Sequence, residues 1–123
     1  MKSKLLVAGI AGLVAVSAAN AMDVGTFLAK AGTLQERGVL AVFASEYGEL
    51  QAEIRTSYAS LKQERLAARG AGRRPAYCPP DPASLTMPEM LAAMTNVPTA
   101  RRAHVQVRDA LRAALARKYP CRD

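Results

Sequence analysis

The sequence predicts an all-α protein, a small single-domain bundle of four to five helices with one disulfide. Apolar residues recur three and four positions apart along most of the chain, and no longer stretch alternates with the two-residue period of a strand. The two cysteines, Cys78 and Cys121, each stand beside proline, which places them in irregular backbone just outside helices. Helical spacing and two flanking cysteines therefore define the expected fold.

Residues 1–21 have the composition of a secretory signal peptide. Lys2 and Lys4 precede an unbroken apolar run from Leu5 to Val16, and Ala19-Asn20-Ala21 fits an A-x-A cleavage site. The run is too short to span a bilayer whose hydrocarbon core is ~30 Å thick. We therefore expect cleavage after Ala21 and a periplasmic domain over residues 22–123.

Export favours a disulfide between Cys78 and Cys121, because oxidising compartments preserve such bonds. The bridge would tie the end of the chain to its middle. A redox role, free thiols and an intermolecular bridge remain as alternatives.

Charge is distributed unevenly along the chain, whose formal net charge is +7. Residues 22–64 hold four Lys and Arg against six Asp and Glu, whereas residues 65–123 hold eleven against four. For an exported protein, this basic half favours an acidic protein surface, lipopolysaccharide or anionic cell-wall polymer over nucleic acid as a partner.

The first helix is predicted from about Asp23 or Val24 to Arg37, and Gly38 is suited to a left-handed C-cap. A short apolar turn over residues 39–43 follows. Ser45 is the expected N-cap of the next helix. The inward face of the first helix would comprise Phe27, Leu28, Ala31 and Leu34.

The second helix is predicted from about Ser45 to Arg69, with a length of roughly 37 Å. That is about the whole diameter of a domain of this size, so one end protrudes or a second subunit covers it. The alternative is a break at Gly48. Its apolar stripe comprises Phe43, Tyr47, Leu50, Ile54, Tyr58 and Leu61.

One long segment rich in glycine and proline, Gly70 to Pro82, separates the second helix from the third. Loops of this length in compact domains are usually functional or disordered, and the prolines with the expected disulfide argue against disorder. Arg73, Arg74 and Tyr77 are therefore the candidate partner-binding residues. The alternative is a solvated connector that only restrains the fold.

Thr86 and Glu89 form a capping box for a short helix that ends near Thr95. The methionines of this helix share one face, which raises copper(I) binding as a possibility, although helical packing explains them better without histidine or cysteine nearby. They are Met87, Met90 and Met94.

A final helix is predicted over about Thr99 to Lys118, with a bend near His104. Its inward face would comprise Val107, Leu111, Ala114 and Leu115. Arg101, Arg108 and Arg112 align on another face, as a solvated row or a partner-binding one.

The residues do not favour catalysis or a bound cofactor. His104 is the single histidine, and cysteines that bond each other leave no thiolate. No cluster has metal-ligand spacing, and no glycine-rich phosphate loop follows a strand. We expect no enzyme, no cofactor and no metal.

Taken in order, several short segments resemble the Rap/Tai family of type VI secretion amidase immunity proteins. They are Asp23-Val24-Gly25-Thr26-Phe27-Leu28, Gly38-Val39-Leu40-Ala41-Val42-Phe43, Tyr77-Cys78-Pro79-Pro80, Pro98 with Arg101-Arg102, Asp109-Ala110-Leu111 and Tyr119-Pro120-Cys121. The similarity covers nearly all of residues 22–123. Gln106 departs from it, because a capping serine would fit the family's pattern there.

The resemblance implies a small helical periplasmic protein that binds a peptidoglycan amidase effector and blocks its active-site cleft without catalysing a reaction. It also implies a homodimer with a protruding loop that enters the cleft, which by position would be Gly70 to Ser84. Two rival functions remain: a periplasmic stress chaperone and a cell-wall-binding helical module.

Overall fold

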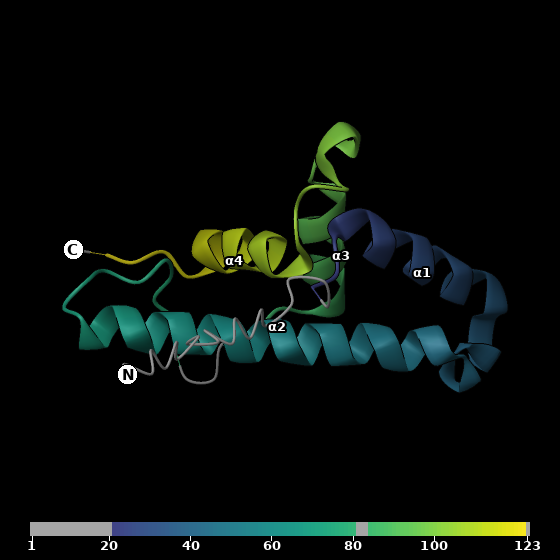
Figure 1. Ribbon diagram of the computed structural model, residues 1–123, viewed down its shortest axis with the longest axis horizontal. Coiled ribbons are helices and arrows are strands. Elements are labelled where there is room, and N and C mark those ends of the chain that lie inside the picture. The colour runs from purple at the N-terminus through teal and green to yellow at the C-terminus, as the bar shows by residue number, and fades with distance from the viewer. Residues whose placement is uncertain (1–20, 81–83, 123) are drawn as a thin grey trace, which may run out of the picture.

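The computed structural model describes residues 21–80 and 84–122 (Figure 1). The predicted signal peptide lies outside these residues, except for Ala21. Within them the chain forms four α-helices, two short 3-10 helices and no strand, and Cys78 is bonded to Cys121. The predicted all-α fold with one disulfide is confirmed.

Helix α1 spans Val24–Arg37, as predicted. Asp23 caps its start, because its carboxylate accepts hydrogen bonds from the Thr26 backbone N–H and hydroxyl, both at 2.8 Å. These bonds lower the pKa of Asp23 below its ordinary value. Gly38 follows the helix at φ +59°, so the predicted positive φ is confirmed, although ψ of −133° differs from a left-handed helix.

The 3-10 helix η2, Gly38–Phe43, turns the chain into helix α2, Ser45–Gly70. The predicted N-cap at Ser45 is wrong by one residue. Ala44 holds that position in extended backbone, and its carbonyl accepts the Tyr47 N–H at 3.1 Å without any side-chain cap.

Gly48 does not break α2, whose 26 residues give a helix about 39 Å long. In Figure 1, α1 lies along the N-terminal half of α2 and α4 (Val107–Lys118) lies along its C-terminal half. Helix α3, Met87–Thr95, stands across between them and packs on both α1 and α4. Each half of α2 is thus covered by a different helix.

The core is centred on α4, which buries five of its residues. Leu50 and Leu61 of α2 are buried, whereas Phe43, predicted to begin the same stripe, is 85% exposed. The buried apolar residues are Val24, Phe27, Leu50, Leu61, Tyr77, Leu85, Ala93, Met94, Val107, Ala110, Leu111, Ala114 and Leu115.

Helix α3 begins with the predicted capping box, since Thr86 and Glu89 exchange side-chain hydrogen bonds with each other's backbone N–H. Met94 is fully buried and Met90 packs against the core, whereas Met87 is 64% exposed. Met90 and Met94 therefore serve packing. Among the described residues, no group of three His, Cys, Asp or Glu is placed to hold a metal ion.

The predicted final helix over Thr99 to Lys118 is wrong in its first part. Residues 99–101 form the 3-10 helix η3, Thr99–Arg101, and α4 begins only at Val107. The reason is tertiary pairing: Gln106 is extended and forms an antiparallel bridge with Asp23. The Val24 N–H donates to Val105 O at 2.8 Å, and the Val107 N–H donates to Met22 O at 3.0 Å.

The disulfide joins the segment after α2 to the segment after α4, with a Cα–Cα distance of 4.8 Å. The Cys78 N–H also donates to Tyr119 O at 2.8 Å. No helix within the described part of the chain is both long and apolar enough to cross a membrane.

Replacing Cys78 and Cys121 together by alanine removes a cross-link between positions 43 residues apart. The chain-entropy model assigns such a loop about 4 kcal/mol, so we expect the free energy of unfolding in urea to fall by about 2–4 kcal/mol. Unfolding of the unmodified protein in reductant is the matched control and should give the same loss. A loss below about 1 kcal/mol in both would contradict a stabilising role for the bridge.

Candidate partner-binding surface

The loop after α2 is held at both ends of its described part, residues 71–80. At its start the Gly72 N–H donates to Arg69 O at 3.0 Å and the Arg73 N–H donates to Ala68 O at 2.8 Å, with Gly72 at φ +69°. At its end stands the disulfide of Cys78. Residues 81–83 of the predicted Gly70 to Ser84 segment lie outside the described residues.

Arg73 and Arg74 are both exposed on this loop, as a partner-binding role requires. Arg74 also reaches the end of the chain, because its guanidinium donates a hydrogen bond to Cys121 O. Arg73 has no hydrogen bond or ion pair through its side chain within the described residues. The two neighbouring arginines thus differ: one braces the loop and the other is available.

Tyr77, the third predicted contact, is only 5% exposed. Its ring belongs to the core, and the Arg65 guanidinium lies over it, 5.9 Å from the ring centroid. Burial raises the pKa of the Tyr77 hydroxyl above its ordinary value. A ring buried to this degree offers a partner little surface, so its position fits an anchor for the loop.

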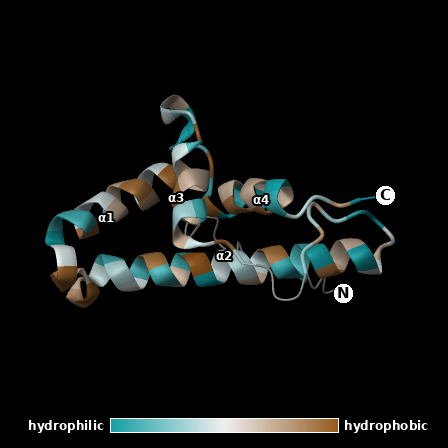
Figure 2. Ribbon diagram, turned by 180° about the vertical axis from the view of Figure 1, so that it is seen from behind, coloured by the Kyte–Doolittle hydropathy of each residue, from teal (hydrophilic) through white to brown (hydrophobic). Residues whose placement is uncertain are grey.

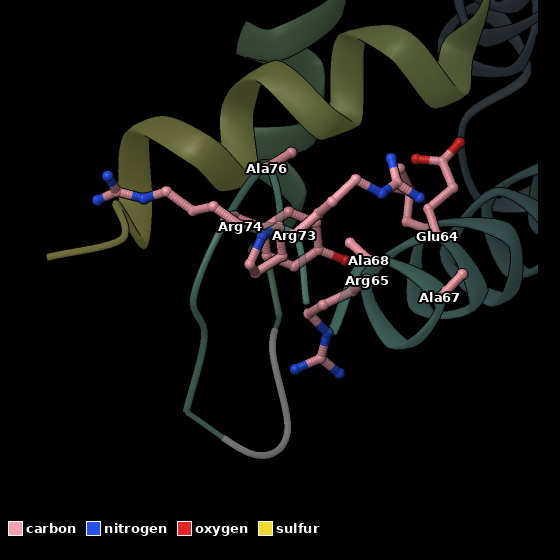
Figure 3. A pocket seen from close by; sticks show the side chains of 10 residues that line it. Glu64, Arg65, Ala67, Ala68, Arg73, Arg74 and Ala76 are labelled. Atoms are coloured by element: carbon pink, nitrogen blue, oxygen red, sulfur yellow. The ribbon is translucent and has the colours of Figure 1, made fainter. Parts of the chain in front are cut away.

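A cavity of about 380 Å³ separates the last turns of α2 from the loop. In Figure 3 its arginines come from two walls, Arg65 from α2 and Arg73 and Arg74 from the loop. Ala67, Ala68 and Ala76 also line the cavity, and their short side chains leave it open between the two walls. The remaining lining residues are Leu61, Glu64, Pro75 and Tyr77.

Glu64, the one acidic residue among the described residues of this lining, is already paired. Arg112 of α4 donates to both of its carboxylate oxygens, at 3.0 and 2.7 Å, and also to Asp109 at 2.8 Å. These carboxylates raise the pKa of the Arg112 guanidinium further. Arg108 donates to Ser60 at 3.1 Å. The Glu64 charge is thus neutralised from outside the cavity.

The predicted arginine row on the final helix is therefore divided. Arg108 and Arg112 brace α4 against α2, whereas Arg101 lies apart, in η3. Arg102 has a local role as well, because its guanidinium donates to Val97 O at 2.9 Å and Thr95 O at 3.0 Å, at the end of α3.

Sequence reasoning missed Arg65. The signal that could have found it is its position one helical turn after the buried Leu61, which places it at the edge of the covered face of α2. Its Nε is buried and has no hydrogen-bond partner in the described part of the chain. Only its stacking on Tyr77, which the sequence does not reveal, brings it to the cavity.

A second set of contacts fixes the far end of the segment, where it enters α3. The Lys118 ammonium donates to Ser84 O at 3.1 Å and to Glu89 at 2.8 Å, and the Tyr119 hydroxyl donates to Ser84 O at 3.1 Å. The Leu85 N–H donates to the Tyr58 hydroxyl at 3.2 Å. The end of α4 therefore latches the start of α3.

The chain matches no family model, and comparison with curated proteins and with solved structures found no match either.

The latch predicts a pH dependence. The hydrogen bond from Lys118 and the capping box hold the pKa of Glu89 at about 2, below its ordinary value of 4.5. A lowered pKa stabilises the fold above pH 4.5, and this contribution is lost as pH falls towards 2. We expect Glu89→Gln to lower the thermal midpoint at pH 6 and to match the unmodified protein near pH 2.

Glutamine preserves the capping box, so this variant isolates the charge. Glu36→Gln, at an exposed position of α1, is the matched control and should change nothing at either pH. If Glu89→Gln lowers the thermal midpoint equally at both pH values, the charge of Glu89 does not account for its contribution to stability.

Proposed function

We propose that this chain is a periplasmic immunity protein that binds a type VI secretion peptidoglycan amidase effector, occludes its active-site cleft and catalyses no reaction. One observation carries the proposal: the basic loop after α2 is exposed at Arg73 and Arg74 and is braced from several sides. The signal-peptide composition and the resemblance to Rap/Tai proteins support the same function.

Rigidity of the loop supports an inhibitory mechanism. The disulfide, the bond from Arg74 to Cys121 O and the buried ring of Tyr77 fix the described part of the loop before any partner arrives. A loop that is already ordered loses little conformational entropy on binding, so more of its contact energy contributes to affinity.

The distribution of basic residues in the chain supports the proposal that its partner is acidic. Eleven of the fifteen Lys and Arg residues after position 21 lie in residues 65–123, the half that contains the loop. Complementary charge accelerates encounter with an acidic cleft and disfavours basic surfaces. A useful antidote needs a nanomolar dissociation constant, about 12 kcal/mol, which an interface of roughly 1,600 Å² supplies when its anchors are good.

The proposal includes a homodimer, and an exposed apolar tip supports it. Four residues of η2 are 56–89% exposed: Val39, Leu40, Val42 and Phe43. Figure 2 shows this turn as a hydrophobic patch at the end of the α1–α2 pair. A large apolar side chain carries on the order of 100–200 Å², so the tip exposes roughly half of the ~800 Å² that each partner buries in a standard interface.

A groove of about 420 Å³ between α1, α2 and α3 supplies the complementary surface. Its apolar lining includes Phe27, Leu34, Leu50, Ile54 and Met90. Since every copy carries both a tip and a groove, two copies related by a twofold axis would make the contact twice. We propose that the tip of each copy enters the groove of the other.

Inhibition of the amidase encoded nearest the gene tests the loop. We expect Arg73→Ala with Arg74→Ala to raise the inhibition constant ~100-fold or more, since arginines in such positions are frequent hot spots. Lys62→Ala with Arg101→Ala removes two exposed charges elsewhere and should leave inhibition unchanged. Tyr77 is excluded from this variant because its loss would disturb the core. Full inhibition by the folded loop variant would refute the assignment.

Sedimentation equilibrium tests the dimer. Phe43→Glu places a charge on a side chain that is 85% exposed, so the monomer should keep its fold while the dimer dissociates. Leu66→Glu, at a 47% exposed apolar position near the other end of α2, is the matched control and should remain dimeric. A monomeric unmodified protein, or a dimeric Phe43→Glu variant, would contradict the proposed contact.

A further inference from the structure

Among the described residues, Arg65 makes no hydrogen bond that would explain its position. Its guanidinium stacks on the buried ring of Tyr77, and its Nε is buried with no acceptor in the described part of the chain. Buried polar groups are nearly always hydrogen-bonded, so the Nε of Arg65 is a buried donor to which the described residues supply no acceptor. The cavity beside the loop is the space from which an acceptor would reach it.

The cavity has an excess of positive charge. Arg65, Arg73 and Arg74 line it, and Glu64, the one carboxylate among the described lining residues, is engaged by Arg112 on both oxygens. Neither Arg65 nor Arg73 pairs with an acidic group among the described residues. An anion in the cavity would therefore meet guanidinium groups from two walls, Arg65 from α2 and Arg73 from the loop.

The donors favour a carboxylate. Guanidinium groups bind the planar, two-oxygen carboxylate with matching geometry, and water exclusion strengthens such bonds. The Tyr77 hydroxyl at the wall makes no hydrogen bond within the described residues, and its raised pKa keeps it protonated as a donor. At about 380 Å³ the cavity lies at the small end of ligand pockets and is large enough to admit a carboxylate side chain.

We propose that this cavity receives an aspartate or glutamate side chain of the amidase, which Arg65 binds from α2 and Arg73 binds from the loop. The inference rests on the proposed function and adds Arg65 to the residues that contact the partner. It also explains why the loop carries arginine beside a cavity lined by alanines.

Titration calorimetry of the periplasmically expressed protein with the amidase tests the assignment. We expect Arg65→Gln to raise the dissociation constant ~10-fold or more. Arg65→Lys keeps the charge but loses the planar guanidinium, so its dissociation constant should fall between those of the unmodified protein and Arg65→Gln. Arg69→Gln removes an equal charge one turn further along α2, outside the cavity, and should stay within twofold of the unmodified protein.

A small probe separates the cavity from the whole interface. N-acetylglutamate should shift the backbone amide resonances of residues 71–77, N-acetylglutamine should not, and Arg65→Gln should abolish the shift. Equal shifts from both probes, or an unchanged response in the variant, would overturn the carboxylate site.

The outcomes distinguish this inference from the proposed function. If Arg65→Gln binds the amidase normally while the Arg73 and Arg74 variant does not, the function stands and the cavity assignment falls. If no variant changes amidase inhibition, the loop function itself falls, whatever the probe does. If the protein binds soluble muropeptides more tightly than it binds the amidase, a cell-wall peptide is the occupant of the cavity. That result would overturn the proposal that an amidase side chain occupies it.

Discussion

The length of α2 is the constraint on which the rest of the structure depends. At about 39 Å, this helix is longer than any single partner that packs on it, so its two halves are covered separately by α1 and α4. Each end then needs its own closure. The C-terminal end is closed by a loop bonded to the chain's end through Cys78 and Cys121, whereas the N-terminal end carries the exposed tip η2.

The charge distribution follows the same division. Where α4 meets α2, Arg112 of α4 pairs with both Glu64 and Asp109, and Glu64 also lines the cavity. Arg65 and Arg73 line the cavity without an acidic partner among the described residues. The packing of α4 thus engages the Glu64 charge that would otherwise offset the arginines of the cavity, and this favours an anionic ligand there.

Local signals predicted the elements whose ends are set locally. The Asp23 cap, the positive φ of Gly38 and the capping box at Thr86 each depend on residues within one helical turn, and the disulfide followed from two cysteines in a chain whose first residues predict export. The start of α4 could not be predicted, because Gln106 pairs with Asp23, which is distant in sequence. Burial of Tyr77 and the role of Arg65 depend on stacking between α2 and the loop.

Separation of the two surfaces along α2 has a functional consequence. The apolar tip lies before its first turn and the basic loop follows its last, so the helix holds them roughly its own length apart. A copy bound through its tip would leave its loop free for a second protein, and a dimer would present two loops at once. Because the disulfide and the latch at Ser84 fix the loop from the α4 side, dimer contacts at the far end need not reshape it. Self-association and partner binding can therefore coexist without competing for the same residues.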